Sequence, residues 1–194
     1  MKNIFLILTC FFTSVFIKCQ QVYSLNADIE DVPKGSYFKD IDGELNPYIG
    51  VWKGTWEGKT IYMELRKVKY YLGTTPTNGI YQDMILGERK VIDANGTILI
   101  DRISNFDELG SEFDGIYTKF SDGNQKQIRF VPKNMCGATA SLDVTFVNPS
   151  KTQMSVHFEY TPSYLENTCP YYDLVKQGGD YPINFPKDIV LTKQ

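Results

Sequence analysis

The chain has few residues that could carry catalytic chemistry. It contains one histidine, His157, and the neighbouring alternate positions are the polar residues Gln153, Ser155 and Glu159. Because every second side chain of a strand lies on the same face, this polar row predicts an imidazole that points to solvent. A Ser–His–Asp site would need the imidazole turned inward beside a nucleophile. We therefore expect a surface histidine and no catalytic residues.

Metal and cofactor chemistry are not predicted either. Zinc sites need several Cys and His ligands, and the chain offers one His and a Cys pair that we expect to be oxidised. Phosphate loops, dinucleotide fingerprints, nucleophile elbows and paired-His zinc motifs are absent from the sequence. The carboxylate pair of a glycosidase is defined by spatial separation, and nothing in the sequence singles out two residues. An enzyme therefore ranks third, behind two non-catalytic hypotheses, and we expect no cofactor.

The start of the chain predicts export. A basic residue, Lys2, precedes an apolar run of fourteen residues, Ile4 to Ile17. A bilayer-spanning helix needs about 20 apolar residues, so this shorter run indicates a secretory signal peptide, assigned to residues 1–20. Lys18 occupies a position where lipoprotein signals prefer a small residue, so cleavage without lipid is favoured, with lipid attachment to Cys19 as the alternative. We expect a periplasmic, outer-membrane-associated or secreted protein.

Charge and size limit the partners. Without residues 1–20, the chain has 18 basic and 23 acidic residues, a net charge of −5, and no basic cluster. Nucleic acid is therefore not expected as a partner, and a membrane only through a lipid anchor. The remaining length suits one domain, which we expect to be monomeric. Its expected partner is a small ligand, a glycan or a protein.

Two cysteines follow the leader, Cys136 and Cys169. In an oxidising compartment, an isolated pair is usually a disulfide. We therefore predict a Cys136–Cys169 bridge, with two buried free thiols as the alternative.

Aromatic side chains are the best candidates for binding. Tryptophan and tyrosine combine a large apolar area with a polar group, which suits contact with a ligand, a glycan or a protein. The candidates are two tryptophans of the first expected strand and six tyrosines near long connections: Trp52, Trp56, Tyr70, Tyr71, Tyr164, Tyr171, Tyr172 and Tyr181. The alternative is that the tyrosines pack the loops onto the end of the domain as a plug.

These residues must be positioned by strands, because apolar residues repeat with period two and not with helical spacing. After a polar arm at residues 21–43, the pattern predicts an antiparallel β domain at residues 44–194. The nine expected strands cover residues 49–57, 60–66, 80–93, 97–103, 115–120, 125–131, 141–146, 153–160 and 188–193. We expect an all-β, antiparallel up-and-down meander of eight to nine strands, closed as a calycin-like barrel, with a two-sheet sandwich as the alternative.

The connections between these strands alternate in length. Tight turns follow strands one, three, five and seven, including the hairpin signal Asn95-Gly96, and longer loops follow strands two, four, six and eight. Successive connections of a meander lie at opposite ends, so we expect every long loop, and both cysteines, at one end. The leading hypothesis is a non-catalytic binding module with its site at this long-loop end. The alternative is a structural or surface-interaction protein of the cell envelope, one version of which is anchored by lipid on Cys19.

Two resemblances support the expected fold. The segment Leu45 to Trp52 resembles the beginning of a calycin or lipocalin barrel, in which Gly-x-Trp follows a short helical turn and the Trp packs the closed end. Nearly the whole chain resembles an uncharacterised family of small exported proteins from Bacteroidota, a domain of unknown function. The matching segments are Cys19-Gln20, Asp31 to Tyr37, Asn46 to Gly50, Thr168 to Pro170 and Asp188 to Gln194. This second resemblance implies a compartment and a fold type, and no site.

Overall fold

The computed structural model describes residues 19–28, 32–75, 77–119, 121–123, 125–133, 135–161, 165–179 and 182–194. All but the last two residues of the predicted leader lie outside this set. The chain divides into two compact units, which are described separately. One comprises Met1–Ile41 and Tyr70–Gln82, and the other comprises Asp42–Lys69 and Asp83–Gln194. Among the described residues, no helix has the length and apolar character needed to cross a bilayer.

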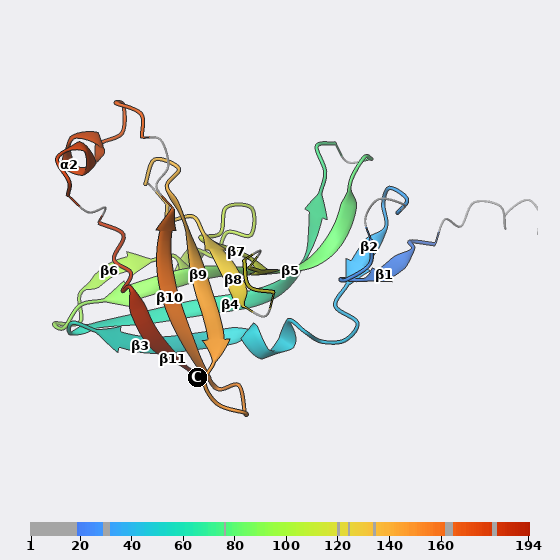
Figure 1. Cartoon of the computed structure of the whole chain (residues 1–194), viewed down its shortest axis with the longest axis horizontal. Helices are drawn as coiled ribbons and strands as arrows, with labels where there is room; N and C mark the ends of the chain where they lie inside the picture. The colour runs from blue at the N-terminus through green and yellow to red at the C-terminus, as the bar shows by residue number, and fades with distance from the viewer. Residues whose placement is uncertain are drawn as a thin grey trace, which may run out of the picture. The chain divides into compact units, whose positions relative to one another are not determined.

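The larger unit is built on a closed antiparallel barrel of eight strands (Figure 1). These are β3 (Gly50–Trp56), β4 (Lys59–Leu72), β5 (Ile80–Ile92), β7 (Phe113–Thr118), β8 (Lys126–Phe130), β9 (Thr139–Phe146), β10 (Gln153–Thr161) and β11 (Asp188–Lys193). Each strand pairs with the next, β11 pairs with β3, and β7 pairs with β5, which closes the ring. The predicted all-β barrel is confirmed, so the sandwich alternative falls.

The barrel interior follows from the period-two pattern. Ile61, Met63 and Leu65 of β4 are fully buried, and the polar side chains between them are more exposed. The interior leaves no room at Gly54, where a Cβ atom would lie 2.7 Å from both Ile189 Cδ1 and Leu191 Cδ2. Burying one such aliphatic side chain stabilises a fold by about 1.5–3 kcal/mol, so this continuous lining is the main source of the barrel's stability.

One predicted strand does not take a place in the ring. β6 (Ile98–Asp101) forms the expected Asn95-Gly96 hairpin with β5, pairing with Lys90–Ile92. After a segment at residues 102–112 that contains η3 (Ile103–Asn105), β7 pairs with the same strand at Leu86 and Gly87. Because β6 and β7 are both antiparallel to β5, they run in the same direction.

This arrangement shows that the predicted separation of turns and loops is wrong. Because β6 and β7 run in the same direction, every connection after β6 lies at the end opposite to the one predicted. The tight turns that follow β3 and β5 therefore share one end with the long connections that follow β8 and β10. The short connections that follow β7 and β9 lie at the opposite end. Cys136 follows β8 and Cys169 follows β10, so the predicted position of both cysteines at one end of the barrel is still correct.

The opposite end of the barrel is closed around Trp52, as the calycin resemblance implies. The short helical turn η2 (Asn46–Tyr48) precedes β3, and Trp52 Nε1 donates a hydrogen bond of 2.7 Å to the carbonyl oxygen of Tyr48. The Phe146 ring centroid lies 4.9 Å from that of Tyr48 and 6.2 Å from that of Trp52. Lys193 Nζ lies 5.3 Å from the centroid of the Trp52 ring. Trp52 is thereby enclosed on several sides.

The smaller unit contains two strands that the sequence pattern did not predict in the polar arm. β1 (Val22–Ser24) pairs in parallel with β2 (Tyr37–Lys39), and β2 pairs in parallel with the start of β5 at Tyr81 and Gln82. The Phe38 ring is buried and stacks on Tyr23, with centroids 5.8 Å apart.

Candidate functional site

The predicted disulfide is present between Cys136 and Cys169, whose Cα atoms are 5.8 Å apart. It joins the connection after β8 to the connection after β10. The second connection also carries α2 (Tyr172–Lys176), the red helix of Figure 1. The bridge therefore holds this long connection at one end of the barrel.

A phenylalanine cluster closes the barrel beneath that connection. Phe185 lies in residues 182–187, which form the last part of the connection, called here the plug segment. Its ring centroid is 6.3 Å from that of Phe113, 5.3 Å from that of Phe130 and 5.9 Å from that of Phe158. Each such aromatic pair contributes about 0.5–1.5 kcal/mol beyond its buried area. Among the described residues, phenylalanine rings anchor the plug segment to the barrel.

A buried arginine holds the same segment by its backbone. Arg89 of β5 is 1% exposed, and its Nη1 donates hydrogen bonds to the carbonyl oxygens of Ile183 (2.6 Å) and Asn184 (2.9 Å). Its Nε donates to Glu112 Oε2 at 2.8 Å, and its guanidinium carbon lies 4.9 Å from the centroid of the Phe130 ring. The guanidinium thus connects a buried carboxylate to two carbonyls of the plug segment.

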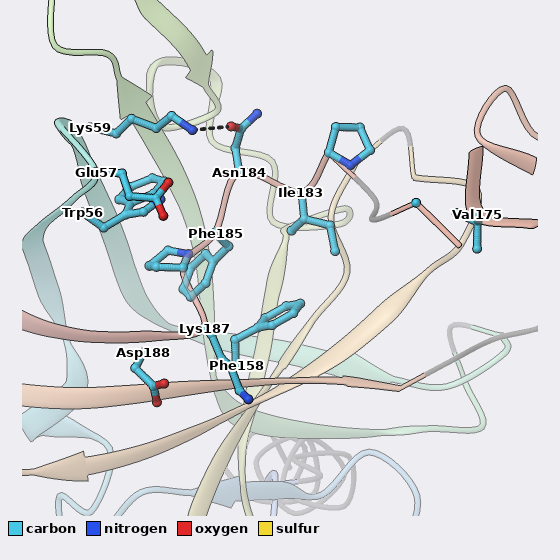
Figure 2. Close-up of a pocket in the computed structure, with 13 residues that line it drawn as sticks. Trp56, Glu57, Lys59, Phe158, Val175, Ile183, Asn184, Phe185, Lys187 and Asp188 are labelled. Carbon is cyan, nitrogen blue, oxygen red and sulfur yellow. Dashed lines mark hydrogen bonds between the residues drawn. The ribbon is translucent and has the colours of Figure 1, made fainter. Parts of the chain in front are cut away.

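A pocket of about 880 Å³ opens beside the plug segment (Figure 2). One wall comes from the β3–β4 turn, which contributes Trp56, Glu57 and Lys59. The plug segment, together with Phe158 and Asp188, provides the facing wall, and Val175 of α2 completes the lining. The dashed line in Figure 2 joins the two walls, where Lys59 Nζ donates to Asn184 Oδ1 at 3.3 Å.

The pocket combines aromatic surface with four charged side chains. Lys59 Nζ lies 5.5 Å from the centroid of the Trp56 ring, and Asp188 Oδ1 lies 2.6 Å from His157 Nδ1. Glu57 and Lys187 also line the pocket, and among the described residues their side chains form no hydrogen bond or ion pair. Glu57 has a φ of 45° and Gly58 a φ of 75°, as the two-residue hairpin between Trp56 and Lys59 requires. One carboxylate and one ammonium group are thus available to a ligand.

His157 has the surface position expected from its strand. Its side chain is 45% exposed, and Asp188 is its hydrogen-bond partner within the described part of the chain. No described Ser, Thr or Cys side chain is hydrogen-bonded to this imidazole, so two members of a Ser–His–Asp arrangement meet without a nucleophile.

The structure brings one of the two tryptophans to the pocket. Trp56 lines it, whereas the predicted binding role of Trp52 is wrong, because that side chain is fully buried at the opposite end of the barrel. Both belong to one face of β3, but four residues of a strand extend about 13 Å, which separates the two ends of a small barrel.

The predicted tyrosines are distributed over several places. Tyr70 and Tyr71 belong to the smaller unit, where Tyr71 and Tyr81 line a second pocket of about 320 Å³. Tyr171 and Tyr172 lie next to the disulfide, where the Tyr171 backbone N–H donates to Cys169 Sγ at 3.4 Å, and they do not line the large pocket. Tyr164 and Tyr181 lie outside the described residues. Cys19, the alternative lipidation site, is an exposed free thiol.

Glu88 is the most unusual titratable group near the site. It precedes Arg89 on β5, is fully buried, and forms no hydrogen bond with a described residue through either carboxylate oxygen. The closest cation is Arg102, whose Nε lies 3.8 Å from Glu88 Oε2. Burial first, and the neighbouring Glu112 carboxylate second, raise the pKa of Glu88 from 4.5 to about 7, although Arg102, the Glu112 backbone N–H and Lys133 act in the opposite direction.

The sequence comparisons identify a family and no relative of known activity. The model of a family described as Family of unknown function (DUF6705) matches residues 1–194. No curated protein and no solved structure matches the chain.

Proposed function

The chain belongs to this family of unknown function, and we propose from its geometry that it is an exported, non-catalytic binding module. Its site is the pocket at the disulfide-bridged end of the barrel. The expected ligand is a small organic molecule with a flat apolar part and polar or charged substituents.

The pocket itself is the observation on which this proposal depends. Ligand pockets are typically about 300–1,000 Å³, apolar for the most part, with a few placed polar groups. The Trp56 and Phe185 rings supply the apolar surface, and Glu57 and Lys187, which have no partner in the described part of the chain, supply one charge of each sign. The plug segment that forms one wall is fixed by Arg89 and by the phenylalanine cluster, so the pocket exists before a ligand arrives. Such preorganisation lowers the entropic cost of binding.

Export is supported by two features of the chain. Disulfides persist mainly in oxidising compartments, and the Cys136–Cys169 bridge holds together the end of the barrel that carries the pocket. The short apolar run at the start of the chain has the length and the basic flank of a secretory leader.

Titration with the fluorescent probe 1-anilinonaphthalene-8-sulfonate tests the proposal. The probe has a flat ring system and an anionic group, so it matches the aromatic wall and Lys187. We expect saturable binding with energy transfer from tryptophan, and affinity about tenfold weaker in Trp56→Ala. Tyr117→Ala is the matched control, because Tyr117 is an aromatic side chain exposed elsewhere on the barrel. Absence of saturable binding, or equal weakening in both variants, would contradict the proposal.

A structural protein of the cell envelope, anchored by lipid, is the second candidate. It is favoured by the exposed thiol of Cys19, which lies two residues after the apolar run and becomes the first residue if the leader is cleaved before it. Intact-mass measurement on the protein recovered from a bacterial envelope decides between the two. An acylated N-terminal cysteine supports the anchored form, and an unmodified N-terminus at residue 20 or 21 eliminates it.

A further inference from the structure

Glu88 is linked to the pocket by an unbroken series of contacts. It interacts with both ends of the segment 102–112, with Arg102 at one end and Glu112 at the other. The Glu112 carboxylate accepts the hydrogen bond from Arg89 Nε and a second one, of 2.9 Å, from the Lys133 backbone N–H. Arg89 in turn donates to the carbonyls of Ile183 and Asn184, two residues that line the pocket.

The surroundings of Glu88 accommodate a neutral carboxyl group better than a charged one. A fully buried carboxylate is stable only with close hydrogen-bond donors. The Glu112 backbone N–H favours the charged form of Glu88, but neither carboxylate oxygen has a hydrogen bond of normal geometry among the described residues. The charged groups that surround it are Glu112, Arg102 and Lys133. Glu112 already neutralises Arg89, and Arg102 Nε is too distant to form a hydrogen bond.

We propose that protonation of Glu88 regulates the pocket, which holds its ligand more tightly when Glu88 is neutral. This inference rests on the proposed binding function. When Glu88 loses its proton, two neighbouring buried carboxylates carry charge, and residues 102–112 must open to admit water or to bring Arg102 closer. Glu112 is the last residue of that segment and the ion-pair partner of Arg89. Movement of Glu112 therefore weakens the hydrogen bonds from Arg89 to the carbonyls of Ile183 and Asn184. The pocket wall is then released.

The test compares wild type with Glu88→Gln at pH 6.0 and pH 8.5. The amide has the size of the acid and stays neutral at both values. Glu108→Gln is the matched control, because Glu108 is an exposed glutamate of the same segment. His157, which contacts Asp188 at the pocket rim, is retained in all three proteins, so any contribution of its imidazole is common to them.

Two measurements are made at each pH: the affinity for 1-anilinonaphthalene-8-sulfonate, and backbone hydrogen exchange of residues 102–112 and 183–185, corrected for intrinsic rates. In wild type and Glu108→Gln, we expect affinity about fivefold weaker at the higher pH, with faster exchange in both segments. In Glu88→Gln, the affinity should change by less than about twofold and the exchange should stay slow.

The proposal is overturned if wild-type affinity and exchange are the same at both pH values, or if Glu88→Gln retains the pH dependence. Failure of the proposed function would give a different result. The probe would then show no saturable binding at either pH, while the exchange data would still decide whether Glu88 controls the wall.

Discussion

The buried ion pair Arg89–Glu112 is the residue-scale feature that positions the pocket wall. The side chains are 2% and 1% exposed, and the 2.8 Å contact joins Nε to Oε2. A buried pair often contributes little net stability, because removing both charges from water costs as much as their attraction returns. Loss of one partner is different, since it leaves the other charge buried and uncompensated.

We therefore expect Arg89→Met to lower the free energy of unfolding by about 3–5 kcal/mol, measured by denaturant titration. Arg66→Met is the comparison, because Arg66 forms an ion pair with Glu64 in which the arginine is 45% exposed. That substitution should cost less than about 1 kcal/mol. Similar small losses in both variants would show that Arg89 does not hold the structure together.

Glu88 makes a separate prediction about stability. Its pKa is raised from 4.5 to about 7 in the folded protein, so folding favours the neutral acid. This contribution to stability is fully present below about pH 4.5 and is lost as the pH rises through about 7. The advantage of Glu88→Gln over wild type should therefore grow by about 2–3 kcal/mol between about pH 5 and pH 8.5. A difference that stays constant with pH would mean that Glu88 is already ionised in the folded state at the lower value.

Neither Glu88 nor Arg89 could be recognised from the sequence. Glu88, Arg89 and Lys90 are three consecutive charged residues, which indicates a solvated stretch of strand. Glu88 and Arg89 are buried, and their contacts come from Arg102, from Glu112 and from the plug segment, in stretches without a periodic pattern. Phe185 was missed for the same reason, because it lies between Pro182 and Pro186 in a connection without strand alternation. Trp56, in contrast, was found by its alternation with Trp52 on β3.

At the scale of elements, β6 accounts for the main error in the predicted architecture. Its residues have a normal strand pattern and a strong hairpin signal, and it does form a strand. The sequence does not show that β6 and β7 occupy the same edge of β5, because that depends on tertiary pairing. Eight to nine strands were expected in the meander, and eight close the ring because β6 stays outside it. The pocket consequently lies where two tight turns and two long connections meet.

The disulfide gives the prediction that belongs to this scale. It closes a separation of 33 residues and ties the connection that carries the plug segment to the connection after β8. Replacing both cysteines by serine should lower stability by about 3–4 kcal/mol on the chain-entropy account, measured by thermal or denaturant unfolding. Cys19→Ser is the control, because that thiol is exposed and free, and should leave stability unchanged. An equally stable double variant would indicate that the packing of Phe185 alone fixes the connection.

At the scale of the whole molecule, alternation and turn chemistry predicted a closed antiparallel barrel, and the isolated cysteine pair of an expected exported chain predicted the disulfide. The apolar rows Ile61-Met63-Leu65 and Leu142-Val144-Phe146 indicated which faces point inward, and closure satisfies the strand edges that an open sheet would expose. The two ends of the barrel differ in character. One is filled by Tyr48, Trp52 and Phe146, and the other carries the pocket beside the plug segment.

The pocket beside Trp56 is proposed to bind a small organic molecule, and a crystal structure of the protein with 1-anilinonaphthalene-8-sulfonate would locate the bound probe. We expect the naphthalene rings against Trp56 and Phe185, with the sulfonate near Lys187. Probe density confined to other surfaces, such as the small pocket beside Tyr71, with an empty site at Trp56, would contradict it.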